Sequence, residues 1–244
     1  MASNCHIEAS RNAPILIVGA GGLGAPAIIA LARAGRGPLL IVDPDPVELS
    51  NLPRQIIYGE SDLGAPKALA APRRLALLAP ELAVEAAVDR LDERNATRYI
   101  ARADFVIDAT DDPAAKFLIN DVCVALGRPF VYGGVLGLSG QAMTVMPGES
   151  ACLRCLFEEP PGGEDAASCR DAGIVGPVAG AIGALQAAEA MRVVAGGRPA
   201  LAGKILTLDG SRTGRIRLAP IAARPGCACG AARSPVSAAD AAHH

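Results

Sequence analysis

A glycine-rich turn directly after a short apolar run constrains the fold of this chain more than any other feature. Residues 14–18 are expected to form a buried strand and residues 23–34 a helix, and the run GAGGLG joins them. The glycine spacing G-x-G-x-x-G lets backbone N–H groups approach a phosphate at the amino end of the helix. A second expected strand, 39–42, completes a β-α-β unit, which is parallel and right-handed. The pattern predicts a Rossmann-like sheet that binds a nucleotide.

The alternation of strand and helix continues to Gly134 and then ceases. Further helices are expected at 67–78, 94–101, 114–125 and 177–194, and further strands at 84–88, 105–107, 130–132, 143–146, 204–208 and 215–218. The last two strands are predicted to form a hairpin. We therefore expect an open, mostly parallel α/β sheet that continues into an antiparallel part. A single domain is predicted over 1–230, followed by a disordered tail over 231–244.

Composition narrows the functions that the chain can have. Hydrophobic residues make up 51% and aromatic residues 3%, so the core is aliphatic, as in buried parallel strands. The 23 basic and 25 acidic side chains give a formal net charge of −2, which disfavours a nucleic-acid partner. The uncharged stretches 13–32 and 172–188 are interrupted by Gly and Pro, and no basic leader precedes the first. We expect a cytoplasmic protein without a membrane partner.

The polar segment 43–62 distinguishes between the nucleotides that the glycine turn could bind. It begins at Asp43, about 20 residues after the turn, where an acid can bind ribose hydroxyls. The string SNLPRQ follows at 50–55, and Lys67 comes shortly after it. A dehydrogenase does not need two cations and an amide here, whereas an ATP site needs them to neutralise three phosphates. An NAD-dependent oxidoreductase is the alternative that the glycine spacing alone leaves open.

A second acidic motif follows the expected strand 105–107. It reads Asp108-Ala109-Thr110-Asp111, and it lies at the carboxyl end of a strand, where an open α/β sheet binds its ligands. A carboxylate at this edge is suited to hold Mg²⁺. Asp111 has an alternative role as the cap of the helix that follows, and the two roles can coexist.

Four of the seven cysteines form two closely spaced pairs. The pairs are Cys152 with Cys155 and Cys227 with Cys229. In a reduced compartment such pairs indicate a metal more than disulfides, and four thiolates suit a tetrahedral structural zinc. Zinc would tie the loop 148–173 to the segment 227–230. The alternative is four reduced thiols without metal.

These motifs, taken in order, resemble those of the MoeB/ThiF/HesA family, relatives of the ubiquitin-activating enzymes. The resemblance rests on the glycine turn, S-N-L-x-R-Q, the G-x-P-K of residues 64–67 and D-x-T-D, and it covers about residues 13–230. It implies ATP-dependent adenylation of the C-terminal glycine carboxylate of a ubiquitin-like sulfur carrier protein that ends in Gly-Gly, with release of pyrophosphate. It further implies a homodimer and a sulfurtransferase or cysteine desulfurase as an additional partner.

The resemblance also assigns the site residues. The residues expected to bind ATP and Mg²⁺ are Gly19, Gly21, Gly22, Gly24, Asp43, Asp45, Asn51, Arg54, Gln55, Lys67 and Asp111. Within this set, Asp43 would hold the ribose and Asp111 the Mg²⁺, while the cations and amides would line the phosphates. The expected catalytic residues are Arg54, Lys67, Asp111 and Cys169. Cys169 matches a cysteine that in some members bonds covalently to the carrier and in others is dispensable.

The sequence departs from the family pattern in three places. The second cysteine pair is CxC where the family usually has CxxC, and Lys116 stands where it often has Arg. Arg11 is too close to the first strand to match the arginine that reaches the partner subunit's ATP. The missing arginine keeps open a non-catalytic or partner-dependent member. A further alternative is an enzyme that adenylates another carboxylate, such as a peptide C-terminus or a modified tRNA base, although the near-neutral charge disfavours tRNA.

Overall fold

The computed structural model describes residues 13–160, 173–211 and 215–230. Arg11, Cys169 and the tail expected over 231–244 lie outside these ranges, and so do residues 161–172 of the loop expected over 148–173.

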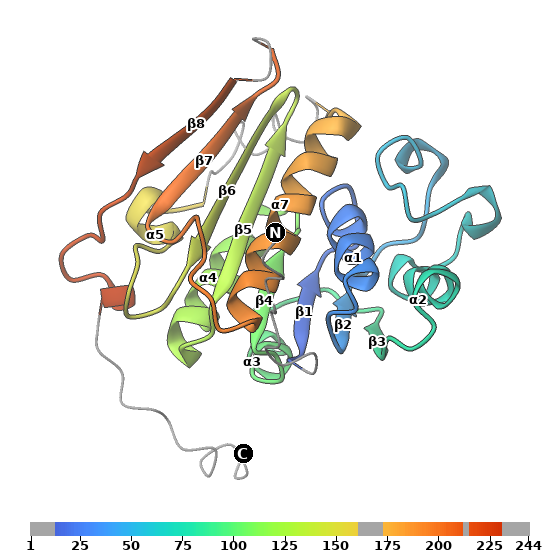
Figure 1. Ribbon diagram of the computed structural model, residues 1–244, viewed down its shortest axis with the longest axis horizontal. Helices are drawn as coiled ribbons and strands as arrows, with labels where there is room; N and C mark the ends of the chain where they lie inside the picture. The colour runs from blue at the N-terminus through green and yellow to red at the C-terminus, as the bar shows by residue number, and fades with distance from the viewer. Residues whose placement is uncertain (1–12, 161–172, 212–214, 231–244) are drawn as a thin grey trace, which may run out of the picture.

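One eight-stranded sheet forms the centre of the described structure, in the order β3-β2-β1-β4-β5-β6-β7-β8 (Figure 1). The strands are β1 (Ile15–Val18), β2 (Leu39–Val42), β3 (Val84–Ala87), β4 (Phe105–Asp108), β5 (Phe130–Leu136), β6 (Ser139–Val145), β7 (Lys204–Asp209) and β8 (Arg215–Pro220). The strands from β3 to β5 in this order pair in parallel, and every pairing from β5 to β8 is antiparallel. The predicted fold class and the predicted late hairpin are confirmed.

Helices cover both faces of the parallel part of the sheet. The helices are α1 (Gly24–Arg33), α2 (Lys67–Leu78), α3 (Ala96–Ile100), α4 (Pro113–Leu126), α5 (Leu153–Leu156) and α7 (Gly176–Val194), with 3₁₀ turns η1 (Leu49–Asn51), η2 (Glu60–Asp62) and η3 (Ala228–Gly230).

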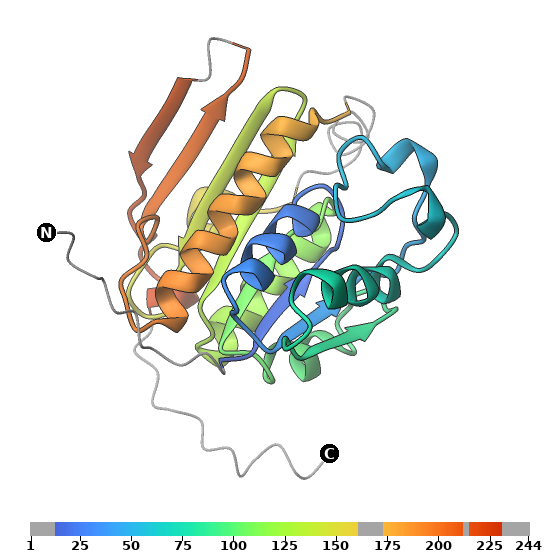
Figure 2. The ribbon, with the colours of Figure 1, turned by 45° about the vertical axis from the view of Figure 1, so that its right-hand side comes forward.

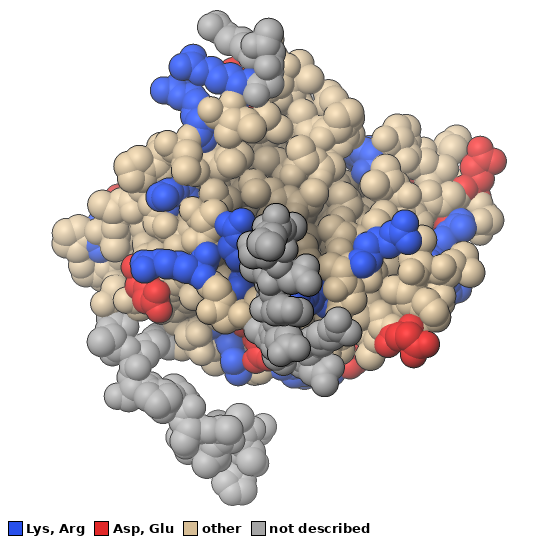
Figure 3. Space-filling view, in the orientation of Figure 1, with Lys and Arg blue, Asp and Glu red and all other residues tan. Residues whose placement is uncertain are grey.

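None of the helices in the described ranges combines the length and the apolarity that crossing a bilayer requires. On the face drawn in Figure 3, charged side chains of both signs are scattered, with some Lys and Arg side chains near the middle of the view, and mostly uncharged side chains surround the upper part of α7.

Alternate residues of the central strands belong to two different hydrophobic clusters. On β1, Ile15 and Ile17 pack with residues of α1, α2 and α7, whereas Leu16 and Val18 pack with residues of α3 and α4. Successive side chains of a strand point to opposite faces, so the two clusters lie on the two sides of the sheet. Since both sides are covered, the central strands are apolar throughout, which is the pattern that the sequence shows.

The strands β5 and β6 extend well beyond the expected ranges 130–132 and 143–146. The sequence does not predict their full lengths, because both strands contain glycine and glycine has a low strand propensity. In the structure these glycines allow α7 to lie directly on the sheet. A methyl group at Gly133 would lie 2.5 Å from Gln186 Nε2, and one at Gly140 would lie 2.5 Å from Ile182 Cγ1. Two smaller differences are that α3 is shorter than the expected 94–101 and that α5 lies within the expected loop 148–173.

The helices α1 and α7 lie side by side on one face of the sheet, as Figures 1 and 2 both show. Their closest approach is at Gly183, where a methyl group would lie only 2.2 Å from the main-chain oxygen of Leu23. At Gly180, one turn earlier on the same helix, no atom of the residues that the structure describes lies within 4 Å of the same position. The approach of α7 to the beginning of α1 therefore depends on the missing side chain at 183.

This difference predicts opposite effects for two substitutions on one helix. Gly180→Ala should raise the free energy of unfolding by about 0.5–1 kcal/mol, because alanine favours the helix. Gly183→Ala should lower it by about 1–3 kcal/mol, because the added methyl forces α7 away from α1. Urea unfolding followed by circular dichroism measures both, and equal stabilisation by the two would contradict the close approach.

Candidate active site

The glycine turn lies where the carboxyl ends of β1 and β4 meet, which is the position where the strand order reverses. Gly19 has a φ of 94°, a conformation that favours glycine. A methyl group at Gly19 would lie 2.6 Å from the main-chain oxygen of Ala109 and 3.2 Å from the nitrogen of Thr110. The turn therefore packs directly against the segment that follows β4. Ligands of open α/β sheets bind at this kind of switch point.

Asp43 is fixed beside the turn by two main-chain hydrogen bonds. Its Oδ2 accepts from the N–H of Ala20 at 2.7 Å, and its Oδ1 accepts from the N–H of Asp45 at 2.8 Å. Burial raises the pKa of the Asp43 carboxyl, while the Ala20 hydrogen bond and the charge of Lys67 oppose that rise. Each oxygen keeps the capacity to accept a further hydrogen bond, so the group can bind a ligand hydroxyl.

Tyr58 connects the turn to the beginning of α2. Its hydroxyl lies 3.0 Å from the main-chain oxygen of Ala20 and 3.2 Å from that of Lys67. The side chain of Lys67 is itself buried, and its Nζ lies 3.2 Å from Asp45 Oδ2. Burial raises the pKa of the Tyr58 phenol, which keeps it protonated. Sequence analysis missed Tyr58, and the one signal for it is an aromatic residue within a polar segment.

Arg54 and Gln55 belong to a tight turn that follows η1. The main-chain oxygen of Asn51 accepts hydrogen bonds from the N–H groups of both residues, at 3.1 and 3.0 Å. A methyl group at Gly21 would lie 3.5 Å from Gln55 Nε2, and one at Gly22 would lie 3.7 Å from Arg54 Cγ. Both side chains therefore border the glycine turn.

Gln55 has a buried acceptor without a donor. The residue is only 3% exposed, and no atom in the described part of the chain donates to its Oε1. A buried acceptor without a partner is costly unless water or a ligand supplies the donor. Gln55 is therefore a candidate ligand contact in its own right.

Asp111 follows the segment that packs against the glycine turn. Its neighbour Thr110 contacts Gly19, and the Asp111 side chain is exposed. The alternative role of Asp111 as a helix cap is wrong. Asp112 caps α4 by accepting from the N–H of Ala114 at 3.0 Å, because the proline at 113 fixes the first helical position one residue later.

Lys116, which stands where the family often has Arg, points at the same strand end. Its Nζ lies 3.2 Å from Oδ1 of the fully buried Asp108. Burial raises the pKa of the Asp108 carboxyl, and the charge of Lys116 opposes that rise. Sequence analysis included Asp108 in the D-x-T-D motif but gave it no role.

The four predicted metal ligands converge on one point. The Sγ atoms of Cys152, Cys155, Cys227 and Cys229 all lie within 4.8 Å of one another. The separation is 3.6 Å between Cys152 and Cys227 and 3.4 Å between Cys155 and Cys229. Tetrahedral zinc with bonds of 2.3 Å places its sulfur ligands about 3.8 Å apart, so the four thiols fit such an ion. The CxC pair reaches the cluster because η3 turns the chain between its two cysteines.

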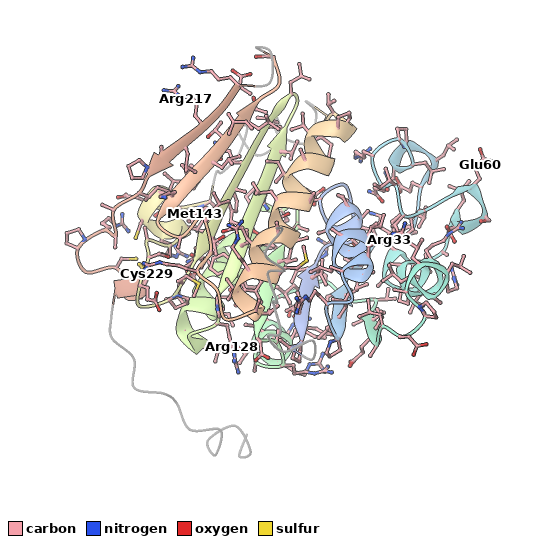
Figure 4. All side chains as sticks on the ribbon, in the orientation of Figure 1. Arg33, Glu60, Arg128, Met143, Arg217 and Cys229 are labelled. Atoms are coloured by element: carbon pink, nitrogen blue, oxygen red, sulfur yellow. The ribbon has the colours of Figure 1, made fainter. Side chains whose placement is uncertain are left out.

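The expected residues thus form two separate groups. The side chains of Asp43, Arg54 and Gln55 border the glycine turn, and Tyr58 joins the backbone of Lys67 to it. Asp111 follows the segment that packs against Gly19. The cysteine cluster lies elsewhere, beside α4 and α5, where Figure 4 labels Cys229. Cys123, on α4, is fully buried and lies in the hydrophobic core.

Residues 4–229 match the model of the ThiF family. The chain is 42% identical over 208 residues to the "Sulfur carrier protein adenylyltransferase" of Thermus thermophilus, which covers 83% of this chain and 76% of that protein. It is 42% identical over 195 residues to the "SAMP-activating enzyme E1" of Haloferax volcanii, covering 80% and 72%.

Other relatives are longer or more distant. The "Adenylyltransferase and sulfurtransferase MOCS3" of Anopheles gambiae is 38% identical over 218 residues, and the chain spans 49% of its length. Among solved structures, E. coli MccB with ATP superposes with a TM-score of 0.79 at 23% identity, covering 91% of this chain and 68% of that one. The fold is therefore that of MccB. The matched relatives have the adenylyltransferase names that the sequence predicts, and the chain belongs to the ThiF family.

Proposed function

We propose that this chain uses ATP to adenylate the C-terminal glycine carboxylate of a ubiquitin-like sulfur carrier protein, with release of pyrophosphate. Family membership and the names of the relatives in Thermus and Haloferax support this proposal. The structural observation that carries it is the gathering of Asp43, Lys67 and Arg54 around one glycine turn. Carboxylate, ammonium and guanidinium groups together match the ribose and the phosphates of a nucleoside triphosphate.

The chemistry follows from charge. The attacking carboxylate is ionised at neutral pH, so the reaction needs no general base. The enzyme must instead bring two anions together in line and neutralise the charge on the phosphates. Asp43 holds the ribose, and Lys67 and Arg54 bind the phosphates. Asp111 would hold Mg²⁺, which would supply further positive charge against the phosphates. Gln55 Oε1 accepts from a donor on the nucleotide or on a water that it holds.

Three groups complete the proposed site. Asn51 Nδ2 donates to Ser50 Oγ at 3.1 Å, and its amide oxygen has the capacity to accept a hydrogen bond. Asp45 pairs with Lys67 and orients its amine. Cys169 either bonds covalently to the carrier or is a spectator thiol. The proposal further includes a cytoplasmic homodimer, with a sulfurtransferase or cysteine desulfurase as the source of sulfur.

Pyrophosphate exchange in the presence of a carrier that ends in Gly-Gly tests the function. Arg54→Ala and Asp111→Ala should each reduce the exchange rate more than tenfold, equivalent to about 1.4 kcal/mol or more, because each removes charge that the transition state requires. The folded state should persist in both variants. Arg33→Ala is the matched control, since Arg33 ends α1 at the opposite end from the glycine turn (Figure 4).

The competing functions predict different results in the same assays. An NAD-dependent oxidoreductase would be stabilised against heat by NAD and not by ATP with Mg²⁺. A non-catalytic member would bind the carrier without exchange, and an enzyme acting on a peptide C-terminus would exchange with the peptide alone. Exchange within tenfold of the wild-type rate in both variants would contradict the assigned roles.

We propose that the four-cysteine cluster holds one structural Zn²⁺. Zinc would supply a crosslink between α5 and the segment after β8, which the N–H of Arg224 also joins by donating to Cys155 Sγ at 3.2 Å. Elemental analysis after metal-free purification and zinc repletion should find one zinc per chain. Cys229→Ala should lose that zinc and unfold at a lower temperature, whereas Cys123→Ala should retain it. Absence of zinc from the repleted wild-type protein would exclude the site.

A further inference from the structure

A buried ion pair lies beneath the segment that carries Asp111. Asp108 ends β4 and is fully buried. Lys116 Nζ lies 3.2 Å from its Oδ1 and 3.4 Å from its Oδ2, and also donates to the main-chain oxygen of Gly133 on β5 at 2.5 Å. Thr110 donates to Asp108 Oδ1 from its N–H at 3.2 Å and from its hydroxyl at 2.9 Å. The Asp108 carboxylate thus connects α4 to the turn 108–111.

The main chain of Asp108 is held as well, from the opposite face of the sheet. Gln186, on α7, is fully buried, and its Nε2 donates to the main-chain oxygen of Asp108 at 2.6 Å and to that of Val131 at 3.3 Å. The end of β4 is therefore held from both faces of the sheet. Lys116 binds the side chain of Asp108, and Gln186 binds its main-chain oxygen.

Asp111 has no such support of its own. In the described ranges no group donates a hydrogen bond to its carboxylate, and the side chain is exposed. Its position relative to the glycine turn is consequently set by the backbone of 108–111. Thr110 belongs to both contacts, since its nitrogen borders Gly19 and its hydroxyl binds Asp108.

We infer that Lys116 is a positioning residue for the adenylation proposed above. By holding the Asp108 carboxylate, it sets the path of the turn 108–111 and so presents Asp111 to Mg²⁺ beside the phosphates. Loss of Lys116 leaves a buried carboxylate without its cation, and the turn must rearrange to hydrate it or to find another donor. The inference rests on the proposed function for the role of Asp111, and it predicts a defect in the use of Mg²⁺.

The test is the Mg²⁺ concentration that half-saturates the ATP-induced rise in melting temperature of the full chain. Lys116→Met should raise this concentration about tenfold, equivalent to about 1.4 kcal/mol of lost Mg²⁺–ATP coupling. Lys116→Arg keeps the charge, and arginine often stands here in the family, so it should stay within about threefold of wild type. Thr110→Val removes one donor to Asp108 without burying a free charge, and should raise the concentration about threefold.

Arg192→Met is the matched control for a merely structural effect. Arg192 Nη1 lies 3.4 Å from Oε1 of Glu189, a carboxylate that is 1% exposed, near the far end of α7. This variant should lower the melting temperature without changing the Mg²⁺ requirement. A wild-type Mg²⁺ requirement in Lys116→Met overturns the inference; if that variant does not fold, the same result in Thr110→Val overturns it.

The same measurement separates this inference from the proposed function. Wild-type protein that is stabilised by ATP and Mg²⁺ but shows no carrier-dependent exchange contradicts the proposed function, while the Lys116 comparison still decides the role of that residue. Wild-type protein with no stabilisation by ATP at any Mg²⁺ concentration contradicts both.

Discussion

The structure depends on how the peptide groups of Ala20 are held. The N–H of Ala20 donates to the Asp43 carboxylate, and its carbonyl accepts from the Tyr58 hydroxyl. Through these two bonds the glycine turn is tied both to the end of β2 and to the segment that leads into α2. The same Tyr58 hydroxyl contacts the carbonyl of Lys67. The residues that supply the acid and the amine of the proposed ATP site therefore take their positions from one residue of the turn.

The helix α7 unites the parallel and antiparallel parts of the sheet in a comparable way. Residues three apart lie on one face of a helix, and Gly183, Gln186 and Glu189 each use this face for a different attachment. Gly183 packs against the beginning of α1. Gln186 donates to the last residue of β4 and to the second residue of β5. Glu189 accepts from the Thr144 hydroxyl on β6 at 2.8 Å and from the N–H of Leu201 at 2.8 Å. An otherwise apolar helix thus carries Gln186 and Glu189 inward, while Arg192 is exposed.

The sequence predicted the features that depend on local patterns, and it did not predict those that depend on contacts between distant residues. The strands β1 and β2, the helix α7 and the convergence of four cysteines follow from apolar runs and residue spacing, and all were predicted. The lengths of β5 and β6 were not, because Gly133 and Gly140 are poor strand formers whose value depends on the distant α7. Tyr58 was missed for the same reason, since its importance lies in a hydrogen bond to a residue 38 positions away.

Two lysine–carboxylate pairs lie at the same edge of the sheet and differ in burial. Their burial indicates which lysine is available to bind a ligand and which one is held in a structural ion pair. The Lys67 side chain is 7% exposed but its partner Asp45 is 54% exposed, so water can hydrate Asp45 when the amine turns to another anion. The Asp108 carboxylate is fully buried, and the side chain of its partner Lys116 is 11% exposed. Separating that second pair would strand a charge in the interior, a cost of about 3–5 kcal/mol. In the proposed mechanism, an arriving triphosphate therefore takes Lys67 from Asp45, whereas Lys116 stays with Asp108 and keeps the turn in place.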